Sequence, residues 1–186
     1  MAHILKEFAK HCGVKTGKPV IKDFFVPILD QEYITIDTSN CIGDSEYFYF
    51  KEYVDAFKAL RKKDIKVYNI CGDKKVENAD NYYDELSSNQ CNFLIKNSKL
   101  HICVDNATGH IASIYKAPTI VLFSHSQPRL SMPLWNTKGT ECLEPEYKNG
   151  KPAYFPNKDN SVVNTIYPDR IIEATYKLTD FLKPSR

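Results

Sequence analysis

Short apolar runs alternate along the chain with longer stretches in which apolar residues recur every three or four positions. The run "EYITID" (32–37) alternates and is rich in β-branched residues, so we expect it to be the first core strand. Further strands are expected at 64–72, 100–104 and 118–123, and "NYYDEL" (81–86) could add a short one. The helical spacing predicts helices over 2–12, 50–63, 87–98, 108–116 and 168–182.

Strands that alternate with helices, each strand a short apolar run, are typical of a parallel sheet covered on both faces. We therefore predict one Rossmann-like three-layer α/β/α domain with a mostly parallel sheet, over residues 32–186. Residues 1–31 are expected to form an N-terminal helix and an extended linker. The segment 124–167 has little periodicity, and is either a functional loop or a surface excursion.

Composition narrows the class of protein. The 186 residues are 42% hydrophobic and 26% charged, and the net charge of +2 is too small to indicate binding to nucleic acid or to a membrane surface. We find no apolar stretch long enough to span a membrane, and the N-terminus lacks the apolar core of a signal peptide, so we predict a cytoplasmic protein. The six cysteines form no C-x-x-C pair, which makes a zinc site or a disulfide framework unexpected.

The turn after the run 100–104 is the strongest candidate for chemistry. Ligands of such sheets bind outside the carboxyl ends of the strands, and this turn leads directly into a helix. The free amides and the positive dipole at a helix start form a phosphate site, and small residues such as Ala107 and Gly109 let an anion approach. Asp105 could cap the helix or accept hydrogen bonds from ligand hydroxyls, and His110 could donate one.

The same residues also have an ordinary structural interpretation. Asp, Asn and Thr are common helix caps, and a histidine in a first turn is more often packed or solvated than bound to a ligand. A Ser-His-Asp hydrolase and a dinucleotide-binding dehydrogenase are excluded, because the chain has neither a G-x-S-x-G elbow nor a G-x-G-x-x-G turn after its first strand.

The stretch "SKLHICVDNATGHIASIYKAPTIVLFSHSQPRLSMP" (98–133) resembles the C-terminal signature of family 9 glycosyltransferases, the heptosyltransferase family. Asp105 matches the acid of that signature, Asn106 its Ser/Thr, and His110-Ile111-Ala112 match directly. Ala117-Pro118 matches the start of the next strand, and weaker similarity covers most of residues 30–182.

The resemblance implies the C-terminal, donor-binding half of a GT-B enzyme, which binds a nucleotide diphosphate sugar and needs no metal or other cofactor. It implies that the turn Asp105, Asn106, Ala107, Thr108, Gly109 and His110 holds the diphosphate and sugar, together with Ser39 and Ser126. An acid after the second strand would lie near the base and ribose. Glu77 is our candidate and Asp73 the reserve, and a solvated loop charge is the alternative for both.

Several positions depart from the family pattern. Ala107 stands in place of a glycine, Ser124-His125-Ser126 in place of Gly-Pro-Thr, and the position of a phosphate-binding lysine falls near Tyr47. Lys51 is better read as a helix-surface lysine. The family's catalytic base belongs to an N-terminal half that nothing in this sequence matches.

Three functions remain open. The first is a glycosyltransferase that transfers a sugar to a glycan acceptor with the help of an N-terminal GT-B half. The second is a non-catalytic nucleotide- or glycan-binding or scaffold module, and the third, weaker, is a GT-B-like epimerase. If the N-terminal half is absent, apolar side chains of the last helix, at 170–182, should be exposed or covered by self-association.

Overall fold

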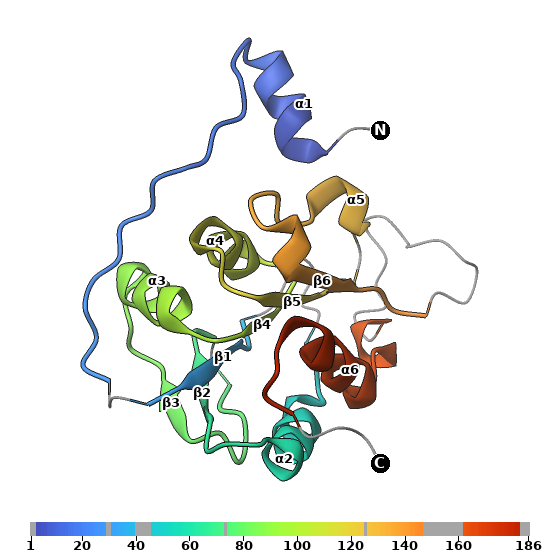
Figure 1. The fold of residues 1–186 in the computed structure, drawn as a ribbon. Helices are drawn as coiled ribbons and strands as arrows, with labels where there is room; N and C mark the ends of the chain where they lie inside the picture. The colour runs from blue at the N-terminus through green and yellow to red at the C-terminus, as the bar shows by residue number, and fades with distance from the viewer. Residues whose placement is uncertain are drawn as a thin grey trace.

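The computed structural model describes residues 3–28, 31–39, 46–72, 74–124, 126–146 and 162–182. Within them lies one sheet, in which six strands run parallel in the order β3-β2-β1-β4-β5-β6 (Figure 1). The strands are β1 (Tyr33–Asp37), β2 (Lys66–Ile70), β3 (Asn81–Tyr83), β4 (His101–Val104), β5 (Thr119–Leu122) and β6 (Thr140–Leu143). The strand order reverses between β1 and β4, as in the doubly wound Rossmann fold, so the predicted fold class is confirmed.

Helices cover both faces of this sheet. The helices α2 and α6 lie on one face, and α3 and α4 lie on the other (Figure 1). Their bounds agree with the predicted ones to within a few residues: α2 (Phe50–Leu60), α3 (Ser88–Asn97), α4 (Ala107–Tyr115) and α6 (Pro168–Leu178). The segment 124–167 contains elements that the periodicity did not predict, namely α5 (Pro128–Ser131), two short 3-10 turns, η1 (Thr137–Gly139) and η2 (Val162–Thr165), and the edge strand β6.

Side chains of β1 alternate between the two faces of the sheet and join different apolar clusters. Ile34 and Ile36 point to the α2–α6 face, where they join the largest apolar cluster of the protein. Tyr33 belongs to the smaller cluster on the α3–α4 face, where its ring stacks on Tyr68 at 4.5 Å. The two faces are therefore packed by different means, one mainly apolar and the other partly polar.

The C-terminal helix is packed on its own sheet. Ile171, Ile172, Phe181 and Leu182 are all buried, and Leu182 pairs with Arg61 at the end of α2 through an antiparallel bridge. The expectation that the apolar side chains of 170–182 are exposed is therefore wrong, because α2 and the sheet already cover them. Tyr176 and Leu178 of the same helix stay partly exposed.

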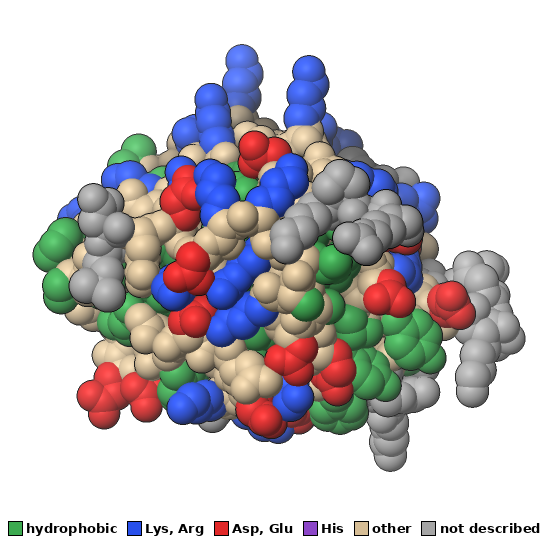
Figure 2. Space-filling view, turned by 60° about the horizontal axis from the view of Figure 1, so that its bottom comes forward, with side chains coloured by type: hydrophobic (Ala, Val, Ile, Leu, Met, Phe, Trp, Pro, Cys, Tyr) green, Lys and Arg blue, Asp and Glu red, His purple; other side chains and the backbone are tan. Residues whose placement is uncertain are grey.

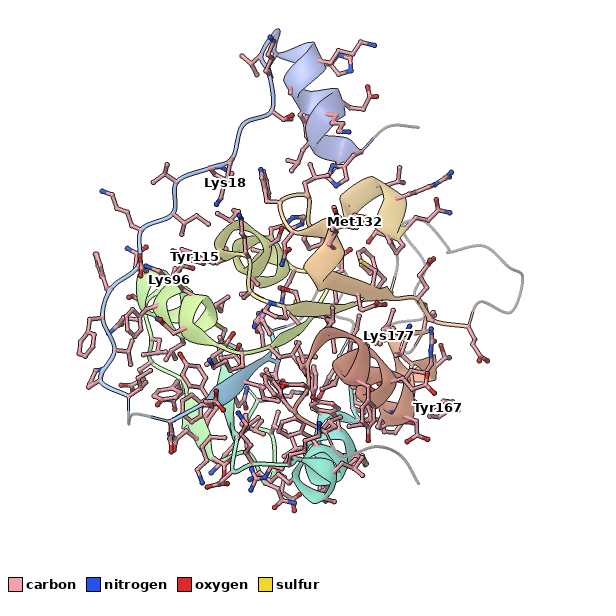
Figure 3. All side chains as sticks on the ribbon, in the orientation of Figure 1. Lys18, Lys96, Tyr115, Met132, Tyr167 and Lys177 are labelled. Atoms are coloured by element: carbon pink, nitrogen blue, oxygen red, sulfur yellow. The ribbon has the colours of Figure 1, made fainter. Side chains whose placement is uncertain are left out.

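The N-terminal helix α1 (Ile4–His11) lies beside α5, and the extended segment after it runs back along α3 and α4 (Figure 1). A ring nitrogen of His3 lies 2.9 Å from the carbonyl oxygen of Met132, which Figure 3 labels below α1. Further along the segment, the carboxylate of Asp23 pairs with Lys96, and Lys96 also lies over the ring of Tyr115 (Figure 3). Polar contacts thus hold the segment on the domain.

The surface carries charges of both signs. Figure 2 shows Lys and Arg side chains interleaved with Asp and Glu rather than gathered into one patch. Ion pairs such as Lys58–Asp80 and Lys66–Asp64 join many of these groups. Among the helices that the structure describes, none has the length and apolarity needed to cross a membrane.

Candidate functional site

The carboxyl ends of β1 and β4 meet at one buried carboxylate, Asp37. The two strands are parallel neighbours, so the residues that follow them lie at the same edge of the sheet. One oxygen of Asp37 accepts a hydrogen bond from the backbone N–H of Ser39 at 2.8 Å. The other accepts from Nδ2 of Asn106 at 2.9 Å and from the hydroxyl of Thr108 at 2.6 Å. Asp37 therefore fixes the loop after β1 against the start of α4.

The network continues into the sheet through His101, the first residue of β4. Its Nε2 lies 3.0 Å from the Thr108 hydroxyl, and its Nδ1 lies 2.9 Å from the hydroxyl of Thr35. Burial lowers the pKa of His101 to about 4, so the ring is neutral at pH 7. A neutral ring that donates from Nε2 and accepts at Nδ1 satisfies both hydroxyls, and lets Thr108 donate to Asp37.

The first turn of α4 begins at an asparagine cap. Oδ1 of Asn106 accepts from the backbone N–H of Thr108 at 3.0 Å, so Asn106, and not Asp105, caps the helix. Ala107 is exposed, whereas Gly109 is buried against the sheet. A Cβ on Gly109 would meet Sγ of Cys103 at 3.0 Å, a tight contact, so a glycine here lets the helix pack closely on the strand. The helix start that faces solvent is therefore made by Ala107 and Thr108.

Asp105 belongs to a second polar cluster, on the β5 side of the turn. Its carboxylate accepts a short hydrogen bond from the hydroxyl of Ser126, and the Ser131 hydroxyl lies 3.5 Å away. Burial raises the pKa of Asp105, and burial also lowers the pKa of His110. The negative charge of Asp105 opposes that lowering, because the carboxylate attracts the protonated form of the His110 ring. Asp105, His110 and Ser126, all predicted site residues, are thus brought together.

A pocket of about 340 Å³ opens beside the first turn of α4. Ala107 and Thr108 form one wall, and Ser88 in the first turn of α3 forms another. Two helix starts therefore converge on the same space, and each brings a positive dipole end. The remaining wall comes from the ends of β2 and β3 and from inside α3 and α4, with Cys71, Gly72, Tyr83, Asp84, Leu86, Cys91, Asn92 and Ile111.

Sequence reasoning missed Tyr83 and Asp84 as members of this pocket. They come at the end of β3 and directly after it, which is the edge of the sheet where ligands of this fold bind. Their position at the end of a strand could have identified them, but β3 has only three residues and was a weak prediction. Leu86 and Ile111 supply apolar surface beside them.

Glu77, the predicted nucleoside contact, does not line the pocket beside α4. Glu77 is exposed and lines a separate pocket of about 210 Å³, together with Lys51, Lys74 and Lys75. The ammonium of Lys51 pairs with Asp55 at 2.9 Å, as expected of a helix-surface lysine. Asp73 and His125 lie outside the described residues.

Tyr47, which the resemblance places near the position of the family's phosphate-binding lysine, is a core residue. The ring of Tyr47 is buried, and its hydroxyl donates to the carbonyl of Ile166 at 2.7 Å. Burial raises the pKa of Tyr47, so the hydroxyl is neutral. Over the described part of the chain, no three His, Cys, Asp or Glu side chains gather as the ligands of a metal ion would.

Comparisons with known proteins agree with this architecture. The profile of glycosyltransferase family 9 (heptosyltransferase) matches residues 50–154. A search of curated protein sequences finds no significant match. Among solved structures, E. coli heptosyltransferase WaaC with ADP superposes with a TM-score of 0.63 at 12% identity, over 92% of this chain and 54% of that one.

Two further structures are similar to the same extent. The family 9 glycosyl transferase of Veillonella parvula DSM 2008 has a TM-score of 0.63 at 15% identity, over 93% of this chain and 49% of that one. TibC, an iron-containing dodecameric glycosyltransferase of enterotoxigenic E. coli H10407, has a TM-score of 0.62 at 16% identity, over 89% and 50%. The chain thus spans about half the length of these proteins.

Proposed function

This chain belongs to glycosyltransferase family 9, and we propose that it binds the nucleotide diphosphate of a sugar donor for transfer of the sugar to a glycan acceptor. One observation carries the proposal: the starts of α3 and α4 converge on one pocket at the carboxyl edge of the sheet. Helix starts bind phosphate through their free amides, and this edge is where Rossmann-like sheets take their ligands. The pocket volume of about 340 Å³ falls in the usual range of small-molecule sites.

The lining of the pocket suggests how a nucleotide would lie. The phosphates would approach the start of α4 at Ala107, where the helix dipole is positive, because the Thr108 amide already donates to the Asn106 cap. The base would pack on Tyr83, with Leu86 and Ile111 as further apolar contacts. The carboxylate of Asp84 would accept hydrogen bonds from the ribose hydroxyls.

Asp105, His110 and Ser126 would then face the sugar, because they lie on the opposite side of the α4 start from the base. Ser39 and Asn106 would act as positioning residues, since the carboxylate of Asp37 holds both. Within the proposal the phosphate charge is met by amides and side chains, with no resident metal. The base that activates the acceptor hydroxyl would come from an N-terminal GT-B half, as in the family pattern. We also keep the prediction of a cytoplasmic protein.

A second function, that of a nucleotide- or glycan-binding module without catalysis, is favoured by one observation. Tyr47 stands where the family pattern has a phosphate-binding lysine, and its hydroxyl is committed to a buried hydrogen bond. The chain therefore lacks at this position a cation that would stabilise the leaving diphosphate. Donor binding without turnover is the outcome that this alternative predicts.

Calorimetric titration with ADP tests the proposal, because ADP is the ligand named for the similar WaaC structure. We expect binding by the wild type and about tenfold weaker binding by Asp84→Ala, which corresponds to about 1.4 kcal/mol. Glu77→Ala is the matched control, since it removes an exposed acid from the other pocket.

The pair of variants separates the two assignments. If Glu77→Ala loses ADP and Asp84→Ala keeps it, the nucleoside lies in the lysine-lined pocket. If the wild type binds neither ADP nor other nucleoside diphosphates, donor binding is wrong and the scaffold interpretation stands. Turnover of a nucleotide sugar with a glycan acceptor, measured on ADP-binding protein together with an N-terminal GT-B half, distinguishes the enzyme from the binding module.

A further inference from the structure

Two cysteines from different elements meet at the wall of the pocket. Cys71 follows β2 directly, and Cys91 lies at the fourth position of α3. Their Sγ atoms are 2.8 Å apart, with the Cys71 thiol donating to the sulfur of Cys91. A disulfide has a sulfur–sulfur bond of about 2.05 Å, so the two atoms need to close by less than about 1 Å.

The backbone on both sides holds the sulfurs in this arrangement. Cys71 has a φ of 53°, a left-handed conformation that is uncommon for a residue with a side chain. Gly72 follows with a φ of 79°, and a Cβ there would meet the backbone nitrogen of Ser39 at 2.5 Å. Cys91 sits just inside the start of α3, which Ser87 and Gln90 fix through a capping box.

The pair is accessible to small reagents. Both cysteines line the pocket of about 340 Å³, and Cys71 is only half-buried. By contrast, Cys103 is fully buried beneath Gly109, and Cys12 is exposed at the end of α1. The protein therefore contains an inaccessible thiol and an exposed thiol for comparison.

We propose that Cys71 and Cys91 form a reversible disulfide by exchange with a low-molecular-weight disulfide such as oxidised glutathione. Sγ of Cys71 attacks one sulfur of oxidised glutathione, and the first glutathione leaves with the Cys71 proton. Sγ of Cys91 then attacks Sγ of Cys71, and the second glutathione leaves with the Cys91 proton. Two protein thiols are oxidised to one disulfide, and one disulfide is reduced to two glutathione thiols.

The environment of Cys91 suits the second step. Cys91 lies just inside the start of α3, and the positive end of that helix favours a thiolate near it. The bridge would tie the end of β2 to α3 across one wall of the pocket. It depends only on the geometry of the two cysteines, so it stands or falls separately from nucleotide binding.

Thiol mapping by mass spectrometry tests the proposal on the wild-type protein. After incubation with oxidised glutathione, denaturation and alkylation of the remaining thiols, we expect one peptide pair to be linked through Cys71 and Cys91, with the buried Cys103 alkylated. Dithiothreitol should restore six alkylated cysteines. Six alkylated cysteines before reduction, or a link between other cysteines, would overturn the proposal.

Single substitutions provide the controls. In Cys91→Ser, glutathione should remain attached to Cys71, because the resolving thiol is gone. Cys12→Ser should keep the bridge, since Cys12 lies at the end of α1, outside the pocket lining. The oxidised wild type should also melt several degrees higher than the reduced protein, and Cys71→Ser should not respond to oxidation. A mixed disulfide that persists on wild-type Cys71 would show that Cys91 does not resolve it.

Discussion

The two faces of the sheet differ in what fills them. On the α2–α6 face, side chains such as Ile34, Ile36 and Phe57 pack as a continuous apolar cluster. On the α3–α4 face, the smaller apolar cluster is interrupted at the carboxyl edge by the buried Asp37–Thr108–His101 network. Alternate residues of the same strand, β1, contribute to both faces.

This difference separates the source of stability from the source of the site. Apolar burial is non-directional and stabilises in proportion to area, so the α2–α6 face can be built from periodicity alone. Buried polar groups must be satisfied one by one, but a satisfied network holds its atoms in fixed positions. On the α3–α4 face, hydrogen bonds to Asp37 replace apolar contacts at the point where the loop after β1 meets the start of α4.

The largest effect is expected from a cavity on the apolar face. Phe57→Ala removes a fully buried ring between α2, α6 and the sheet, and should lower the free energy of unfolding by about 3–5 kcal/mol. Urea denaturation followed by circular dichroism measures this change. Phe48→Ala is the matched control, because the ring of Phe48 is 60% exposed and its loss should change little. A loss below about 1 kcal/mol in Phe57→Ala would mean that α2 can collapse onto the vacated space.

The next effect is expected from the acid at the centre of the polar network. Asp37→Ala leaves the donors of Ser39, Asn106 and Thr108 without their acceptor, and should cost about 3 kcal/mol of unfolding free energy. Asp84→Ala, which removes an exposed acid at the same edge, should leave the unfolding free energy unchanged. Equal stability of the two variants would show that the network does not hold the α3–α4 face together.

The sequence predicted one of these faces better than the other, for a physical reason. Helical spacing in 50–63 and 168–182 indicated the sides of α2 and α6 that are buried, because apolar periodicity and burial have the same cause. The edge strand β6 was missed, since "TECL" has no apolar run and two of its residues are partly exposed.

The sequence predicted the turn at the start of α4 but not the buried groups that hold it. The turn 105–110 stood out because its polar residues interrupt apolar runs. Asp37 and His101 were missed because each lies within an apolar run, where a core role is assumed. Their partner Thr108 is 71 residues from Asp37, and no local pattern reports such a contact. The pairing of Cys71 with Cys91 was unpredictable for the same reason.

A pH dependence should distinguish the polar face from the apolar one. The pKa of His101 is about 4 in the folded protein, below its usual value near 6.5 in the unfolded chain. The unfolded state therefore binds the proton first, so stability from neutral His101 is complete above about pH 6.5 and is lost as the pH falls toward 4. The slope should approach about 1.4 kcal/mol per pH unit within that window.

Urea denaturation at several pH values between 7 and 4 measures this slope, and His101→Gln is the reference. Glutamine can hydrogen-bond to Thr35 and Thr108 but does not titrate, so the variant should show a shallower dependence. Other titrating groups, including His110 and Asp105, remain in both proteins and cancel in the difference. Parallel curves for the two proteins would show that His101 is not the source of the pH dependence.

The smallest effect concerns the exposed start of α4. Ala107 lines the pocket and stands where the family pattern has a glycine. The substitution Ala107→Gly removes its Cβ and so restores the family residue. If phosphate approaches the amide here, the variant should bind ADP several-fold more tightly, an effect of about 1 kcal/mol or less. Glycine also weakens a helix slightly, so a small loss of unfolding free energy should accompany the gain. Calorimetry and urea denaturation on the same samples separate the two terms, and unchanged affinity with reduced stability would place the phosphates away from Ala107.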